Sequence, residues 1–409
     1  MEVKKIKKIL IDFGIRYTKV GFIGESEPVK ILQTPSLINL EEYFQEKSNN
    51  KNILSFIKNS SQKNLEIEDF ALKIIKETLQ IYKSDKYNYY CYILFDLDIK
   101  EKFKEIITSF IKYLYESFLF IVSIKIIPKN IFPIFVSGFY SGIILHCGYL
   151  FSTITVVNNG LNVISKKIGY SSCDMQKMIY NIILNDVKNM KNGNKYDENK
   201  YEILKKNLVK YVDDIMVRIS YILNKKVSQE YKSLISGEEV KEKETMTKIG
   251  FYSDLPIFKI DFNTRIIIGE KLFGENSENN FAYLILKTLA EDVPCEIRKK
   301  IGSNIVLSGG LTMIEGFHQR FLDELNFIAD NNREFLRLKG IRKDLRVHRI
   351  IYPRNILTWV GASLFFGNNR NNFPGNEINR EVKEDGEKKI VNKKMDNDEL
   401  NKLFDNLKI

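Results

Sequence analysis

The sequence predicts an α/β protein with an internally duplicated core. Two strand–turn–strand units of the same kind occur, one near the start of the chain and one after residue 142, and helical patterns lie between them. A repeated unit is typical of a duplicated fold, and alternation of strands and helices is typical of an α/β architecture. We therefore expect two lobes, one for each copy of the unit.

The first unit begins with a buried strand at residues 9–11 (ILI). Residues 12–14 (DFG) break this strand, residues 17–23 resume extended structure, and residues 24–26 (GES) turn the chain again. An apolar run bounded by Gly, Asp and Ser is typical of a strand between turns.

The second unit has the same layout. Its apolar strand lies at residues 143–145 (IIL), and residues 147–148 (CG) break it. A β-rich stretch follows at 152–157, the sequence NNG at 158–160 predicts a hairpin turn, and the chain returns at 161–164.

Between the two units, apolar residues at helical spacing predict helices at 68–81 and 99–114. Residues 92–95 (YILF) predict a strand between these helices. The apolar stretch at 117–127 is broken by Ser123 and predicts a buried strand with its approach.

After the second unit, residues 174–223 are largely helical in pattern, and so are residues 278–289. The charged stretch at 224–248 predicts a loop or a weak surface helix. The polar, Asn-rich tail at 368–394 lacks the apolar surface needed to fold, so we expect it to be disordered. Residues 400–407 predict a short amphipathic helix, which packs either on its own domain or on a partner.

Composition narrows the class of protein. The chain of 409 residues is long enough for two sizeable cores, and its net charge of +11 is lysine spread through an Asn-rich background. That pattern favours a solvated surface over a nucleic-acid patch. The four cysteines form no CxxC pair, which favours reduced thiols in a cytosolic or nuclear protein. We expect no secretory signal, and no apolar run reaches the roughly 18 residues that span a bilayer.

The first turn carries a candidate phosphate site, in the sequence DFGIRYTK at residues 12–19. Gly14 at a tight turn lets backbone N–H groups approach a phosphate, Lys19 can reach the same phosphate, and the carboxylate of Asp12 can hold a hydrated metal. Such a turn on its own is equally typical of an ordinary hairpin.

A second candidate lies at residues 308–313 (SGGLTM), after a predicted strand at 304–307 and before a helical pattern at 316–327. Paired glycines, here Gly309 and Gly310, let a ligand or another backbone come close at a strand-to-helix turn. A plain loop would have the same sequence features.

The order of these motifs resembles the actin superfamily. Residues 305–317 (IVLSGGLTMIEGF) resemble the adenosine-loop region of actins, and residues 359–364 (WVGASL), with the sole Trp, resemble another actin segment. The resemblance runs from about residue 9 to residue 367. It implies an actin-like duplicated ribonuclease-H-type fold, with two lobes around a nucleotide cleft.

The resemblance also implies a division of the chain. The first lobe would contain residues 1–136 and 356–367, and the second residues 137–355. Within them, a shortened subdomain 2 would lie at about 37–66 and subdomain 4 at about 174–267, and residues 368–409 would form a mostly disordered tail with the short terminal helix.

By the same resemblance, the cleft would take ATP or ADP, with Mg²⁺ held by Asp12 through water. The residues expected to bind nucleotide are Asp12, Gly14, Lys19, Gly148, Gly309, Gly310 and Met313.

Several positions depart from the actin pattern. Lys129 stands where actins have a glutamine, His146 where they have a second metal carboxylate, and Thr153 where they have a histidine near the attacking water. Met216 and Val217 replace a Lys-Glu pair that contacts the adenosine. Hydrolysis needs a metal and a positioned water, so we expect a degenerate site without catalytic residues, a pseudo-ATPase rather than an enzyme. His146 would either face phosphate or be satisfied by neighbouring backbone.

Within the superfamily, the chain resembles the divergent actin-related proteins at the pointed end of dynactin. The features are residues 147–149 (CGY), residues 293–300 (VPCEIRKK) and the short segment between 34–36 and 68. The resemblance implies a cytoplasmic, cytoskeletal subunit that caps the actin-like minifilament and supports dynein-based transport along microtubules. Its partners would be actin-like filament subunits and other pointed-end subunits, not nucleic acid.

Two other functions stay open. A nuclear actin-related subunit of a chromatin-remodelling complex would be favoured by a basic targeting run and large insertions, and only modest lysine clusters occur, at 4–5 and 393–394. An ATP-hydrolysing actin-like protein would need both metal carboxylates, of which the sequence offers Asp12 alone.

Overall fold

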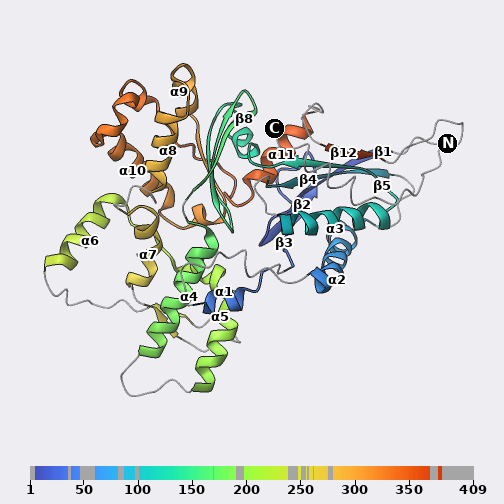
Figure 1. Ribbon diagram of the computed structural model, residues 1–409, viewed down its shortest axis with the longest axis horizontal. Coiled ribbons are helices and arrows are strands. Elements are labelled where there is room, and N and C mark those ends of the chain that lie inside the picture. Colours follow the sequence, from blue (N-terminus) through green and yellow to red (C-terminus); the bar gives the residue numbers. More distant parts are fainter. Residues whose placement is uncertain are drawn as a thin grey trace, which may run out of the picture. The chain divides into compact units, whose positions relative to one another are not determined.

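The computed structural model groups the chain into two compact units of interleaved sequence (Figure 1). Unit 1 comprises residues 1–38, 57–139 and 356–409, and unit 2 comprises residues 39–56 and 140–355. The structure describes residues 5–35, 38–46, 60–81, 87–96, 101–168, 170–189, 198–237, 247–249, 255, 258–260, 262–274, 280–368 and 376–379.

Unit 1 is built on a six-stranded sheet with the strand order β12-β5-β4-β1-β2-β3. The strands are β1 (Lys5–Asp12), β2 (Tyr17–Phe22), β3 (Lys30–Gln33), β4 (Tyr87–Phe95), β5 (Ile121–Pro128) and β12 (Asn376–Asn379). Strands β1, β4 and β5 run parallel to one another, whereas β2, β3 and β12 pair antiparallel to their neighbours. The central position of β1 explains why its last four residues are all buried, since parallel strands are covered on both faces.

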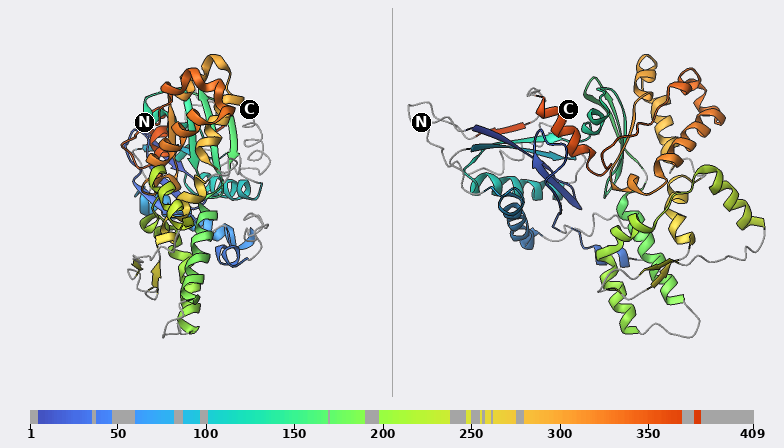
Figure 2. Two further views of the ribbon diagram at one scale, coloured as in Figure 1. Left: turned by 90° about the vertical axis from the view of Figure 1, so that its left-hand side faces the viewer. Right: turned by 180° about the vertical axis from the view of Figure 1, so that it is seen from behind.

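Helices α2 and α3 lie along one face of this sheet (Figure 2). The helical segments of unit 1 are α2 (Ser60–Leu72), its π-helical continuation η2 (Lys73–Thr78), α3 (Glu101–Ser117), the 3-10 helix η3 (Phe132–Ser137) and α11 (Leu357–Gly367). The ring of Phe13, just after β1, lies 6.3 Å from that of Phe70 in α2 and 5.0 Å from that of Phe110 in α3.

Helix α11 is fixed against the sheet by the sole tryptophan. The indole N–H of Trp359 is fully buried and donates to the carbonyl of Leu10 at 3.1 Å. Gly361 lets the helix approach η3, because a Cβ there would lie 1.9 Å from the carbonyl oxygen of Phe132. This hydrogen bond joins α11 to β1, and it satisfies a donor that would otherwise be buried without a partner.

Unit 2 contains a four-stranded sheet with the order β11-β6-β7-β8 and a separate antiparallel pair, β9 with β10. The strands are β6 (Gly142–Cys147), β7 (Ser152–Asn158), β8 (Leu161–Ile168), β9 (Thr247–Ile249), β10 (Phe258–Ile260) and β11 (Ile305–Ser308). The α-helices are α1 (Leu40–Gln45), α4 (Ser172–Asn189), α5 (Glu198–Ile219), α6 (Lys225–Gly237), α7 (Phe262–Leu272), α8 (Phe281–Glu291), α9 (Cys295–Gly302) and α10 (Phe317–Asn331). The described part of this unit also contains two 3-10 helices, η4 (Gly310–Met313) and η5 (Arg333–Asp344).

The predicted α/β fold and its repeated unit are confirmed. In unit 1, β1 pairs antiparallel with β2 and parallel with β4; in unit 2, β6 pairs antiparallel with β7 and parallel with β11. In each unit a third antiparallel strand, β3 or β8, follows. The same core is therefore built twice.

Of the loop or weak surface helix expected at 224–248, the first half forms a helix, α6. Asn224 caps it by accepting from the N–H of Val227 at 2.9 Å, and the hydroxyl of Ser228 donates to Glu270 at 2.7 Å. The cap and the contact of Ser228 hold this helix within a lysine-rich sequence. Residues 238–246 lie outside the described residues.

The prediction that the tail at 368–394 is disordered is wrong for residues 376–379, which form β12 antiparallel to β5. Strand pairing uses main-chain groups, so a polar sequence adds to a free sheet edge without an apolar face of its own. The predicted terminal helix at 400–407 lies outside the described residues.

The predicted division placed residues 37–66 with the first lobe. In the structure, residues 39–56 belong to unit 2. The reason lies in α1, which packs against α4 and α5 of that unit.

The pairing of β12 can be tested with Glu377→Pro/Ile378→Pro. Neighbouring residues of a strand alternate in the side to which their N–H points, so the pair of prolines removes one ladder donor whichever residue supplies it. Hydrogen–deuterium exchange of the β5 amides at 123–126 that point toward β12 should accelerate at least tenfold, whereas those that point toward β4 should stay protected. A Thr pair at the same positions should preserve protection, and unchanged exchange in the proline variant would show that β12 does not pair there.

Candidate functional site

The turn between β1 and β2 is tight and held from several sides. A Cβ on Gly14 would lie 2.3 Å from the carbonyl oxygen of Tyr17, so only glycine fits. The hydroxyl of Thr34 donates to the carbonyl of Gly14 at 2.7 Å, and the N–H of Phe13 donates to Leu94 at 3.0 Å. These bonds fix the backbone around the predicted phosphate turn.

Asp12 and Lys19 form an ion pair at this turn. They lie opposite each other in the antiparallel register of β1 and β2, which puts both side chains on one face of the sheet. The ammonium of Lys19 lies 2.9 Å from Asp12 Oδ2. Asp12 has no exposed surface, whereas 15% of the Lys19 side chain is exposed. Lys19 is therefore the accessible member of the pair.

A second ammonium, that of Lys129, lies on the other oxygen of Asp12. Its Nζ is 3.5 Å from Asp12 Oδ1 and 2.9 Å from Asp96 Oδ2. Burial alone would lower the pKa of Lys129, but the Asp96 and Asp12 carboxylates outweigh it and raise that pKa above its ordinary value. Lys19, Lys129, Asp12 and Asp96 together form the four-charge cluster of unit 1, which is formally neutral.

In unit 2, His146 lies in a row of polar side chains across three strands. It is opposite Ser308 in the parallel register of β11 and β6, and opposite Thr153 in the antiparallel register of β6 and β7. The distance between His146 Nδ1 and Ser308 Oγ is 3.2 Å. A side-chain hydroxyl thus meets this ring nitrogen, and both expectations for His146 stay predictions.

Gly309 brings the second glycine motif against the turn between β6 and β7. Its φ of +98° is in the left-handed region, and a Cβ there would lie 2.2 Å from the carbonyl oxygen of Cys147. Gly148 is similarly restricted, since its Cβ would lie 2.6 Å from the carbonyl oxygen of Phe151. Both glycines are therefore required by the close approach of two backbones. Burial raises the pKa of the Cys147 thiol to about 12, so this cysteine is not poised as a nucleophile.

The comparisons with known proteins agree with this architecture. A family model described as Actin matches residues 260–396. The chain carries an actin-family domain. It is 22% identical to actin-related protein 10 of Dictyostelium discoideum over 405 residues, which cover 87% of this chain and 82% of that protein. It is also 22% identical to actin-like protein 7B of Mus musculus, over 80% of this chain and 77% of that protein. Putative actin-29 of Dictyostelium discoideum is 29% identical over 25% of each chain.

The resemblance to the actin superfamily and the actin-like fold are thereby confirmed. The structure brings Asp12, Lys19 and Lys129 together in unit 1. In unit 2 it places His146 beside Thr153, and Gly309 against the Cys147–Gly148 turn. The nucleotide-binding roles assigned to these residues stay predictions.

Two further predicted positions differ in exposure. Met313, at the end of η4, keeps 38% of its surface exposed, and its predicted contact with adenosine stays a prediction. Met216 in α5 is buried, whereas its neighbour Val217 is exposed. Only the second of the two positions that replace the actin Lys-Glu pair therefore faces outward.

The residues around Asp12 do not fit a hydrated Mg²⁺ ion. Mg²⁺ needs oxygen ligands, and both oxygens of Asp12 already face ammonium groups. Among the described residues there is no group of three or more His, Cys, Asp or Glu side chains that could hold a metal ion. The expected water-mediated metal site at Asp12 is thus not matched by its surroundings.

Sequence reasoning missed Asp96 and Arg354. Asp96 follows β4, the parallel neighbour of β1, and the carboxyl ends of parallel strands meet at one sheet edge, so its position could have been noticed. Arg354 accepts from the N–H of Gly309 through its carbonyl at 2.9 Å, and its guanidinium donates to the carbonyl of Thr312 at 2.5 Å. Burial lowers the pKa of Arg354. No motif marks this arginine, which supports the glycine turn from a distant segment.

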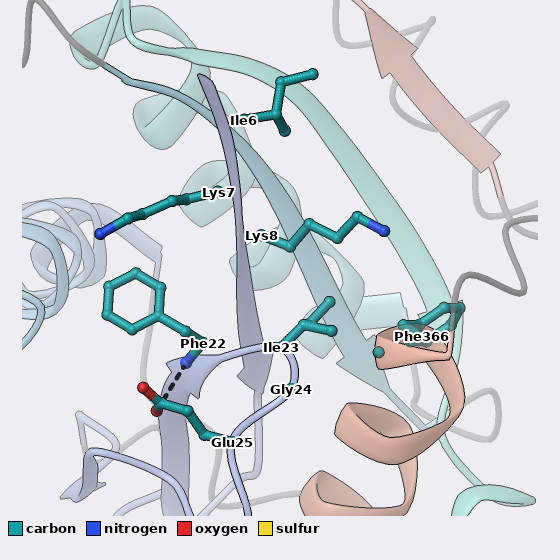
Figure 3. A pocket seen from close by; sticks show the side chains of 9 residues that line it. Ile6, Lys7, Lys8, Phe22, Ile23, Gly24, Glu25 and Phe366 are labelled. Atoms are coloured by element: carbon teal, nitrogen blue, oxygen red, sulfur yellow. Dashed lines mark hydrogen bonds between the residues drawn. The ribbon is translucent and has the colours of Figure 1, made fainter. Parts of the chain in front are cut away.

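A surface hollow of unit 1 lies at the other end of β1 from Asp12 (Figure 3). It is lined by Ile6, Lys7, Lys8, Phe22, Ile23, Gly24, Glu25, Phe366 and Gly367. The ammonium of Lys7 lies 4.5 Å from the ring centroid of Tyr87 and 5.6 Å from that of Phe22. None of the predicted site residues lines this hollow. Within the described part of the chain, no helix combines the length and apolar character that crossing a membrane requires.

Gly309→Ala tests the close approach in unit 2. The substitution strains a backbone at φ +98° and overlaps the Cys147 carbonyl, so urea unfolding should show a loss of about 2 kcal/mol or more. Gly310→Ala is the matched control, because a Cβ there meets nothing within 4 Å, and it should leave stability nearly unchanged. Equal stability of the two variants would contradict the geometry of the turn.

Proposed function

We propose that this protein is a structural actin-related subunit that caps the pointed end of the actin-like minifilament of dynactin. The observation that carries the proposal is that α1 is buried against its own unit. The actin resemblance makes the surrounding segment the counterpart of the loop that grips a neighbouring subunit, and here its described part is engaged within the chain.

Helix α1 is held by its aromatic residues. Phe44 is 1% exposed, and its ring centroid lies 5.2 Å from that of Tyr180 in α4. The hydroxyl of Tyr43 donates to Asp174 Oδ1 at 2.9 Å, and the ammonium of Lys177 lies 4.4 Å from the Tyr43 ring centroid. Burial, and then the Asp174 carboxylate, raise the pKa of Tyr43 above its ordinary range. Burying a phenylalanine and a tyrosine in this way stabilises the packing of α1 against α4, here called the seat of α1, by several kcal/mol.

A subunit that holds α1, the described part of this segment, on its own unit would have only one competent end. Filament growth needs a head-to-tail contact that every subunit can repeat, and a unit that offers one side of that contact closes the series. Such a subunit docks on an existing filament but does not build one, which is the property of a cap.

The proposed cleft holds nucleotide without hydrolysing it. Lys129 and His146 stand where the resemblance expects a glutamine and a carboxylate, and Thr153 stands where it expects a histidine. Without a metal and a positioned water, the transition state of phosphoryl transfer lacks its main electrostatic stabilisation. The protein is accordingly a pseudo-ATPase whose role is structural.

The long alignments support the same proposal. Two relatives with actin-related or actin-like names align over four fifths or more of this chain, whereas putative actin-29 aligns over only a quarter of it. Partners would be actin-like filament subunits and other pointed-end subunits, in the cytoplasm and on the cytoskeleton, serving dynein-based transport.

Purification of the tagged protein, followed by mass spectrometry, tests the class of assembly. Co-purified dynactin components support the proposal. Recovery of chromatin-remodelling subunits in their place would overturn it.

The capping role predicts that the purified protein does not polymerise. Under salt conditions that polymerise actin, it should stay in the supernatant on sedimentation and form no regular filaments in negative stain, while an actin control pellets. The reason is that a subunit with only one competent end cannot repeat the head-to-tail contact that filament growth needs. Regular helical filaments of this protein alone would contradict the capping role.

The degenerate site predicts phosphate release at background level in a steady-state assay with Mg²⁺ and ATP. Turnover comparable to that of filamentous actin, if abolished by Asp12→Ala, would show that the site is catalytically competent.

A further inference from the structure

We propose that the buried ammonium of Lys129 takes the part of a divalent cation in unit 1, so that the site binds the polyphosphate of a nucleotide in its metal-free form. This inference rests on the nucleotide cleft proposed above and specifies the ligand's ionic state.

The first step of the argument is the charge on Asp12. A fully buried carboxylate needs a cation close by, and two are present, one for each oxygen. Lys129 is the more deeply placed of the two, with 8% of its side chain exposed, and Asp96 anchors it at 2.9 Å. The cation beside Asp12 is thus supplied by the chain itself.

The second step concerns Lys19, the more exposed partner of Asp12. When a phosphate arrives at the Gly14 turn, Lys19 can leave Asp12 and donate to the phosphate, because a second ammonium, that of Lys129, stays 3.5 Å from Asp12 Oδ1. Charge-assisted bonds from an ammonium to phosphate are about twice as strong as neutral ones. Lys129 therefore frees Lys19 for the ligand, and this is a positioning role that does not require contact with the phosphate.

The third step concerns the metal. A hydrated divalent cation at Asp12 would lie within a few ångström of one or both ammonium groups and be repelled by them. It would have to displace a lysine that is already paired. Magnesium thus gains little at this site, whereas the metal-free polyphosphate, which carries more negative charge, gains the contact with Lys19.

Isothermal titration of the full-length protein with ATP and with ADP, in EDTA and in excess Mg²⁺, tests the proposal. The wild type should bind at least as tightly in EDTA as in Mg²⁺. Lys129→Gln removes the built-in cation and should acquire metal dependence, with binding at least tenfold tighter in Mg²⁺ than in EDTA. Lys76→Gln, at an exposed lysine of η2, is the matched control and should behave as the wild type.

Asp96→Asn provides a second variant if Lys129→Gln does not fold. It keeps Lys129 on Asp12 and removes one negative charge from the four-charge cluster, so metal-free binding should persist and tighten. Binding of the wild type only in Mg²⁺ would overturn this inference and leave the nucleotide cleft standing. Binding in neither condition would overturn the cleft itself.

Discussion

Asp12 lies at the carboxyl end of β1 without exposed surface, and a carboxylate so placed must be neutralised by cations close to it. Lys19 from β2 and Lys129 after β5 supply the charge, and Asp96 after β4 compensates the second lysine. The site of unit 1 follows from this requirement. It explains why a chain with an actin-family domain has an arrangement that does not suit a hydrated metal, and why hydrolysis is not expected.

Unit 2 repeats the same strand layout with different chemistry. There His146 meets a hydroxyl, and Gly309 and Gly148 are fixed by close backbone contacts. Its other distinctive feature is the aromatic seat of α1, where Phe44 and Tyr180 pack together and Tyr43 bonds to Asp174. A segment that is engaged in this way within its own chain offers little to a neighbour, and this links the local packing to an end position in an assembly.

The repeated strand–turn–strand units, the glycine turns and most helices could be predicted from the sequence, because apolar periodicity and Gly positions report directly on local backbone geometry. Asp96 and Arg354 could not be assigned in this way, since their roles depend on which strands and turns are neighbours in space. The strand β12 was missed because main-chain pairing leaves little trace in the side-chain pattern. The seat of α1 was missed for a related reason: aromatic residues in a short polar segment do not say which surface they will meet.

In the proposed role, this chain ends an actin-like filament because α1 is held on its own unit. Electron cryo-microscopy of the assembly purified through the tagged chain tests it most directly. We expect one copy per filament, at one end, with Phe44 against Tyr180 of the same chain. Copies at interior positions, or residues 38–46 inserted into a neighbouring subunit, would contradict it.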